Sequence, residues 1–120
     1  MTSESLHESA DALSGTTIDR HRAVASLREE LDAIDWYDQR VEATSDAELA
    51  RLLAHNRDDE KEHAAMLIEW LRRRDPGFAH ELATYLFAAG DVVELERDKD
   101  EGHCAPSDGS LGIGSLRRGS

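Results

Sequence analysis

Cysteine, proline and aromatic residues are scarce in this chain of 120 residues. The single cysteine, Cys104, excludes a disulfide within the chain and a cysteine-based zinc site within one chain, and it fits a reducing compartment. No stretch approaches the roughly 20 apolar residues of a membrane span, and residues 1–12 lack the basic and apolar segments of a secretory signal. We therefore expect a cytoplasmic protein with no membrane association.

Basic residues are also few, at 14 Lys and Arg against 26 Asp and Glu, for a net charge of −12. Such a chain repels the phosphate backbone of nucleic acids and anionic lipid surfaces, so neither is an expected partner. An acidic surface instead suits the capture of cations, or simply solubility.

Long stretches without proline or glycine predict helices, and no strand pattern stands out. The first helix is expected over residues 16–41 and the second over residues 46–73, preceded by a capping box that starts at Ser45. A third, shorter helix should begin at Pro76 and end at residue 87 or 88. The expected fold class is all-α: a two-helix antiparallel hairpin plus a short C-terminal helix.

Composition divides the chain into three parts. Residues 1–15 are expected to be a flexible lead and residues 16–97 the helical domain, with one further helical turn around residues 92–96. Residues 98–120 hold five of the eight glycines and several serines, which predicts a disordered tail.

Both long helices carry a row of residues at the alternating spacing of a helical-bundle seam. Each row is apolar at its ends and polar in its middle, where Glu30, Glu60 and His63 stand. A carboxylate in such a seam costs several kcal/mol unless it is paired or binds a cation. The rows are Ala23, Leu27, Glu30, Ile34, Tyr37 and Val41 in the first helix, and Leu49, Leu53, Asn56, Glu60, His63, Leu67 and Trp70 in the second.

A second assignment of the first helix remains open. Val24, Leu27, Leu31 and Ile34 form a competing apolar stripe. In that arrangement Leu31 packs in the core and Glu30 points into solvent.

Glu60 and His63 lie three residues apart, so both side chains project from one helix face and can hold one metal ion. A Glu-x-x-His pair, joined by a glutamate from another helix, is the ligand set of di-iron and di-manganese bundles. This chain offers one such pair and one further seam glutamate, Glu30, which is half of a complete site. We therefore expect a two-fold dimer that completes it, with iron or manganese as the metal and zinc as a competitor.

Several segments resemble the encapsulated ferritins over roughly residues 16–95, and again near the C-terminus. The segments are Arg20-His21-Arg22-Ala23, Glu29-Glu30-Leu31, Asp35-Trp36-Tyr37-Asp38-Gln39-Arg40, His55-Asn56-Arg57, Glu60-Lys61-Glu62-His63-Ala64, Glu69-Trp70-Leu71-Arg72-Arg73, Thr84-Tyr85-Leu86-Phe87 and Gly109-Ser110-Leu111-Gly112-Ile113-Gly114-Ser115-Leu116.

The resemblance implies a half-ferritin that pairs into a four-helix bundle and assembles as a decameric ring. It implies a ferroxidase, which oxidises Fe2+ to Fe3+ with oxygen at a di-iron centre between two chains, for storage as mineral inside an encapsulin nanocompartment in the cytoplasm. Glu30, Glu60 and His63 match the catalytic iron ligands of the family.

Other positions match secondary features of the family. Glu29 and Asp32 match an outer acidic metal-uptake site, although Asp32 stands where glutamate is more usual and is one methylene shorter. Calcium, manganese or zinc are alternative occupants of the main or outer sites. A solvated helix face is an equal reading of Glu29 and Asp32 taken alone. Trp36 and Tyr37 match aromatic residues near the centre, and a core or interface role also suits both.

The tail contains three apolar residues near its end, namely Leu111, Ile113 and Leu116. A glycine- and serine-rich segment cannot bury them by itself, so they can serve as anchors in a groove of a partner. By resemblance, this segment is the peptide that docks the protein to the encapsulin shell.

Two other functions remain open at this point. One is a non-catalytic helical cargo or metal-buffer protein, in which a divalent metal only holds the dimer together. The other is a manganese-dependent peroxide scavenger built on the same bundle.

Overall fold

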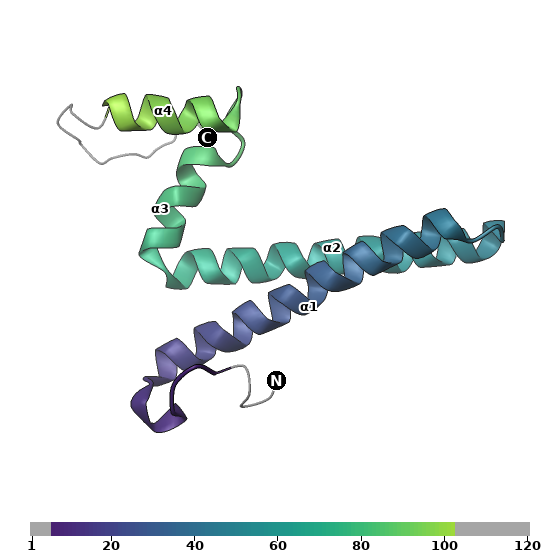
Figure 1. The fold of residues 1–120 in the computed structure, drawn as a ribbon, viewed down its shortest axis with the longest axis horizontal. Helices are drawn as coiled ribbons and strands as arrows, with labels where there is room; N and C mark the ends of the chain where they lie inside the picture. The colour runs from purple at the N-terminus through teal and green to yellow at the C-terminus, as the bar shows by residue number, and fades with distance from the viewer. Residues whose placement is uncertain (1–5, 103–120) are drawn as a thin grey trace. The chain divides into compact units, whose positions relative to one another are not determined.

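The computed structural model describes residues 6–102, and this part of the chain is helical and contains no strand. The all-α prediction is confirmed, with a fourth α-helix where one helical turn was expected (Figure 1). The tail anchors Leu111, Ile113 and Leu116 lie outside the described residues. The elements are a short 3-10 helix η2 (Ala10–Ala12) and four α-helices, α1 (Gly15–Ala43), α2 (Ala47–Arg74), α3 (Pro76–Tyr85) and α4 (Val92–Gly102).

Helices α1 and α2 contact each other and form the antiparallel hairpin that the sequence predicted; in Figure 1 they overlap near the turn and diverge toward the other end. Ser14 caps α1, because its side chain accepts a hydrogen bond from the backbone N–H of Thr17 at 3.1 Å. Neither helix is interrupted by proline or glycine after its first residue, so each continues for about eight turns.

The predicted capping box at Ser45 is wrong by one residue. Asp46 is the N-cap of α2, and its Oδ1 accepts a hydrogen bond from the backbone N–H of Leu49 at 2.9 Å. The backbone N–H of Asp46 in turn donates to Thr44 Oγ1 at 3.2 Å, which fixes the turn before the cap. Serine and aspartate both cap helices well. The backbone conformation of the turn before α2 therefore decides which of Ser45 and Asp46 is the N-cap.

The hairpin buries little apolar surface within one chain. Its buried hydrophobic residues in the described part are Ala23, Ala25, Ala64 and Leu71. The alanines let the two helix backbones approach closely, but they contribute little buried area. Larger apolar side chains such as Leu52 and Met66 remain exposed.

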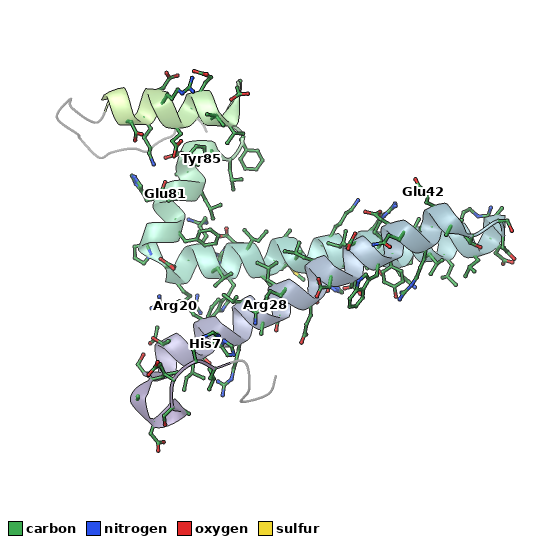
Figure 2. The ribbon with its side chains drawn as sticks, viewed as in Figure 1. His7, Arg20, Arg28, Glu42, Glu81 and Tyr85 are labelled. Atoms are coloured by element: carbon green, nitrogen blue, oxygen red, sulfur yellow. The ribbon has the colours of Figure 1, made fainter. Side chains whose placement is uncertain are left out.

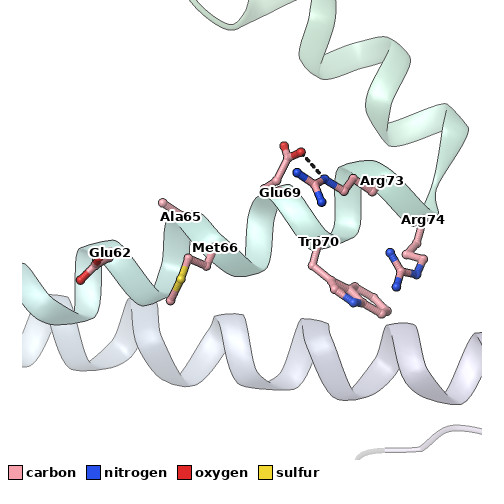
Figure 3. A pocket seen from close by; sticks show the side chains of 7 residues that line it. All are labelled: Glu62, Ala65, Met66, Glu69, Trp70, Arg73 and Arg74. Carbon is pink, nitrogen blue, oxygen red and sulfur yellow. Dashed lines mark hydrogen bonds and ion pairs between the residues drawn. The ribbon is translucent and has the colours of Figure 1, made fainter.

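The C-terminal end of α2 carries a group of charged and aromatic residues, shown in Figure 3. Glu69 accepts hydrogen bonds from Arg72 Nε at 2.7 Å and Arg73 Nε at 2.6 Å, and these lower the pKa of Glu69 to about 2. The Arg74 guanidinium lies 4.6 Å from the centre of the Trp70 ring. Cations in the last turn also interact favourably with the helix dipole.

Asp75 then separates α2 from α3, as the sequence predicted, and its Oδ1 accepts a hydrogen bond from the backbone N–H of Phe78 at 3.1 Å. Helix α3 ends at Tyr85, earlier than the predicted residue 87 or 88. The reason is Phe87, whose φ of 62° is left-handed and incompatible with a continuing helix.

Helix α4 extends beyond the predicted turn at residues 92–96 and crosses residue 98, where the tail was expected to begin. Asp91 begins it by accepting hydrogen bonds from the backbone N–H groups of Val93 and Glu94. Lys99 Nζ donates to Glu81 Oε1 at 2.9 Å, which links α4 to α3; Figure 2 shows Glu81 and Tyr85 on α3. Within residues 6–102, the contacts divide the chain into two units, with the boundary between Ala79 and His80.

Within residues 6–102, no helix has both the length and the apolar character needed to cross a membrane.

Candidate metal centre

The structure brings together the three residues that the sequence predicted as metal ligands. Glu30 projects from the middle of α1, and Glu60 and His63 project from the facing turns of α2. One ligand atom from each residue lies within 4.8 Å of the other two. No other group of three metal-ligating side chains meets this condition within the described residues.

His63 stands between the two carboxylates. Its Nδ1 lies 3.1 Å from Glu60 Oε1 and 3.7 Å from Glu30 Oε1. The side chains of Glu30 and Glu60 are each 25% exposed, and that of His63 is 47% exposed. The group is therefore partly shielded and still open to an ion arriving from solvent.

The burial pattern also decides between the two stripes of α1. Leu31 is 51% exposed, whereas Glu30 lies half-buried against α2. The stripe that places Leu31 in the core of the hairpin is therefore wrong for the single chain. Proximity to His63 offers Glu30 a favourable partner, which offsets the cost of placing a carboxyl group at the helix contact.

The three groups perturb one another's protonation. A hydrogen bond shared with Glu60, and then loss of solvent, raise the pKa of Glu30. The hydrogen bonds from Glu30 and His63 lower the pKa of Glu60. The hydrogen bond to Glu60, aided by the charge of Glu30, raises the pKa of His63. The group thus holds protons that a bound cation must displace.

The donor set fits a divalent transition metal. Two ligand atoms at about 2.0–2.2 Å from one ion can lie up to about 4.4 Å apart, so small side-chain movements suffice to close the present group. Two carboxylates and one imidazole suit iron and manganese, and they also accept zinc. Three protein ligands leave further coordination positions for water, oxygen or groups of a second chain.

A hollow of about 720 Å³ opens beside the group. Glu30 and His63 line one part of it, and the apolar side chains of Met66, Leu67 and Trp70 line another. Met66 is 59% exposed. An apolar wall next to a charged group is typical of a surface that another chain covers.

The other predicted site residues of α1 do not join the group. Glu29 and Asp32 are both exposed, on either side of the half-buried Glu30. Trp36 is 52% exposed, while its neighbour Tyr37 is half-buried beneath the Arg40 guanidinium, which lies 5.5 Å from the ring centre. The two aromatic residues thus point in different directions, as adjacent residues of a helix must.

Two contacts across the hairpin were not predicted from the sequence. Arg57 Nη1 donates to Asp38 Oδ1 at 3.0 Å across the hairpin, and Arg20 Nη1 lies 3.9 Å from Asp75 Oδ2. Both pairs join residues far apart in the chain, and only the register of α1 against α2 brings them together. The sequence carries no local signal for them.

Comparisons with known proteins agree with this architecture. A profile of the EncFtn-like family matches residues 5–89. An encapsulated ferritin-like protein of Rhodospirillum rubrum is 52% identical over 126 aligned positions, which cover 97% of this chain and 90% of the relative. An encapsulin nanocompartment cargo protein of Myxococcus xanthus, EncC, is 33% identical over 78% of this chain and 80% of its own length.

A solved structure supports the fold. The crystal structure of a protein from Nitrosomonas europaea is 57% identical to this chain, with a TM-score of 0.71, and the match covers 73% of this chain and 97% of the other. Sequence, fold and the Glu30–Glu60–His63 group therefore agree, and the chain belongs to the EncFtn-like family of encapsulated ferritin-like proteins.

Proposed function

We propose that this protein is a ferroxidase that oxidises Fe2+ to Fe3+ with oxygen, and that Glu30, Glu60 and His63 bind the iron substrate. The observation that carries the proposal is the convergence of two carboxylates and an imidazole from two helices within 4.8 Å. Membership of a ferritin-like family supports a role in iron chemistry over other uses of such a group.

A second copy of the chain completes the proposed site. One chain supplies three ligands for one ion, whereas di-iron bundles take ligands from four helices. The apolar wall beside Glu30 and His63, and the small buried core of the hairpin, both favour a partner that covers this face. Two hairpins packed around a two-fold axis form a four-helix bundle with a di-iron centre, and further copies form the expected decameric ring.

The residues of the site have distinct roles in this proposal. Glu30 and Glu60 neutralise the charge of bound Fe2+, and they can bridge two ions across the dimer. His63 supplies a nitrogen ligand, and it releases its proton when iron binds. Two Fe2+ ions held side by side would supply two electrons to one oxygen molecule, which takes two protons from solvent to reach the level of hydrogen peroxide, and the ions leave as Fe3+.

The outer positions serve iron uptake in the same proposal. Glu29 and Asp32 are exposed beside the site, on a chain with a net charge of −12. Carboxylates raise the local concentration of cations, which speeds their arrival. Trp36 and Tyr37 belong to a subunit contact near the centre in this proposal, and the exposed surface of Trp36 supports such a contact.

The product is proposed to reach an encapsulin compartment. Leu111, Ile113 and Leu116 would dock the protein to the inner shell wall, with several tails on one ring adding avidity. The support comes from relatives that are named as encapsulated or as encapsulin cargo. Fe3+ released inside the shell would then be stored as mineral.

Single substitutions test the site. Glu30→Ala, Glu60→Ala and His63→Ala should each slow Fe2+ oxidation at least about 100-fold, because each removes one of three ligands. Glu42→Ala is the matched control, since Glu42 is an exposed glutamate of α1 close to the hairpin turn (Figure 2). Normal oxidation by the three site variants would contradict the proposal. Iron binding without oxygen consumption by the wild type would instead support a non-catalytic cargo protein in which the metal only holds the dimer together.

A further inference from the structure

We propose that the Asp38–Arg57 ion pair is a positioning contact, which fixes the axial register of α1 against α2 so that Glu30 faces Glu60 and His63. The inference deepens the proposed function, because it concerns the affinity of the same group for a metal ion. In the described residues, the side-chain hydrogen bonds and ion pairs of Asp38 and Arg57 do not include Glu30, Glu60 or His63, so the pair acts through the two helices.

The pair is a short, direct contact between the two helices. Arg57 Nη1 lies 3.0 Å from Asp38 Oδ1, whereas the His63–Glu30 and Arg20–Asp75 pairs lie at 3.7 and 3.9 Å. Arg57 is 23% exposed, the lowest value for any lysine or arginine that forms an ion pair in the described chain. Its Nε also donates to Asp58 Oδ1 at 3.2 Å, which holds the guanidinium in one orientation on α2.

The place of the pair gives it influence over the metal group. Asp38 follows Glu30 on α1, and Arg57 precedes Glu60 on α2, so the pair lies between the group and the hairpin turn. The Arg20–Asp75 pair lies on the opposite side of the group, toward the open end of the hairpin. One ion pair therefore lies on each side of the metal group along the helix axes.

Apolar packing alone specifies the register weakly. Three of the four buried residues are Ala23, Ala25 and Ala64, and such small side chains interlock less than large ones. A slip of one helical turn moves one helix by about 5.4 Å relative to the other. That displacement exceeds the 4.8 Å span of the present ligand group. In the pair, Arg57 is half-buried and Asp38 is 53% exposed. A polar contact between helices is a known means of fixing register where apolar packing does not.

A positioning role and a purely electrostatic role of Arg57 predict opposite changes in metal affinity when Arg57 is replaced. Arg57→Gln removes a positive charge near the metal group, so electrostatics alone predicts tighter binding of a cation. Loss of register predicts weaker binding, because Glu30 no longer stays opposite His63. The sign of the change therefore separates the two explanations.

The experiment measures the affinity of the full-length protein for Mn2+ from the paramagnetic resonance signal of the free ion. Arg57→Gln should weaken binding about fivefold or more, in the range of coupling between neighbouring side chains. Exchanging the charges, with Asp38→Arg and Arg57→Asp together, should restore affinity to within about twofold of the wild type. Equal or tighter binding by Arg57→Gln, or a charge exchange that binds no better than that variant, would overturn the proposal.

Lys61→Gln is the matched control. Lys61 lies on α2 next to Glu60, and its ion pair with Asp58, at 3.9 Å, stays within one helix. The substitution removes the same charge without removing a contact between helices, so Mn2+ affinity should stay unchanged or rise. Weakening equal to that of Arg57→Gln would contradict a role in register.

A direct reading of register separates this proposal from the proposed function. Spin labels at Arg28→Cys and Arg51→Cys, in a Cys104→Ser chain diluted with unlabelled protein, report the axial offset of the two helices. Arg57→Gln should broaden or shift the label distance by up to about 5 Å, even without metal. If the wild type binds no Mn2+ but the distance responds, the metal proposal fails and the positioning role stands. An unchanged distance contradicts the positioning role.

Discussion

Glu30 is the residue on which the account depends most, because it is the one ligand that α1 contributes to the metal group. A carboxyl group at a helix contact is costly when it stands alone. Here it faces Glu60 and His63, and the contacts among the three side chains raise the pKa values of Glu30 and His63. A metal ion displaces the protons that the group holds and satisfies both carboxylates at once.

These raised pKa values predict how affinity depends on pH. The pKa of His63 is raised above its ordinary value by the hydrogen bond to Glu60, and that of Glu30 is raised as well. Protons therefore compete with the metal, and affinity should increase as pH rises through the pKa of His63, by up to about tenfold per unit for one displaced proton. Titration with Mn2+ at pH 6, 7 and 8 measures the slope.

The matched variant for that slope is His63→Asn. It removes the raised imidazole, so affinity should be weaker overall and should change less between pH 6 and pH 8. A wild-type affinity that does not change over this range would contradict proton competition at His63.

The convergence of Glu30, Glu60 and His63 was predictable from the sequence, whereas the ion pairs between α1 and α2 were not. Glu60 and His63 are three residues apart on one helix, so their spacing alone brings them together. Glu30 could be placed on the seam, but Leu31 offered a competing stripe, and only the packed hairpin decides between them. The Asp38–Arg57 pair depends on the register of two helices, which no local spacing encodes.

At the scale of elements, the hairpin is defined by how its helices begin and end. Ser14 caps α1 and Asp46 caps α2, while the cationic Arg72, Arg73 and Arg74 end α2. These devices set the lengths of the two helices, and therefore which turns face each other. The ends of α1 and α2 thus help to position Glu30, Glu60 and His63, which lie in the middle of the helices.

The cap of α2 gives a prediction about stability. Asp46→Ala should lower the free energy of unfolding by about 1 kcal/mol, because the backbone N–H of Leu49 loses its acceptor. Ser45→Ala should change it by no more than a few tenths of a kcal/mol, since Asp46 occupies the cap. Urea unfolding of both variants measures the difference. A larger loss for Ser45→Ala than for Asp46→Ala would contradict the assignment.

Helix ends were the least predictable part of the fold. The bodies of α1 and α2 followed from long runs without proline or glycine, and Pro76 marked the start of α3. The end of α3 depends on the left-handed conformation of Phe87, which an aromatic residue rarely adopts and which the sequence does not signal. Helix α4 is longer than the predicted turn because Asp91 caps its start and residues 92–101 contain no proline or glycine.

At the scale of the whole molecule, the exposed apolar surface is the feature that most needs explanation. Leu31, Trp36, Leu52 and Met66 are all exposed on a hairpin whose buried core consists mainly of alanine. A chain of this size gains considerable stability by burying such surface in an oligomer. The apolar wall beside the metal group is where a second chain would both cover this surface and complete the site.

Met66 tests that arrangement. Met66→Glu places a charge on the apolar wall of the hollow beside Glu30 and His63, and it should convert the oligomer to monomers because the charge would be desolvated at the contact. Met66→Leu keeps the apolar character and should retain the assembly. Sedimentation velocity of the two variants at equal concentration measures the result. An unchanged oligomer in Met66→Glu would show that this face is not the contact.

The most direct test of the central claim is native mass spectrometry of the wild-type protein during an anaerobic Fe2+ titration, followed by admission of oxygen to an electrode cell. A ferroxidase centre shared between two chains predicts even-numbered assemblies that bind one iron per chain and then consume oxygen. Assemblies that bind iron without consuming oxygen, or monomers that bind none, would contradict it.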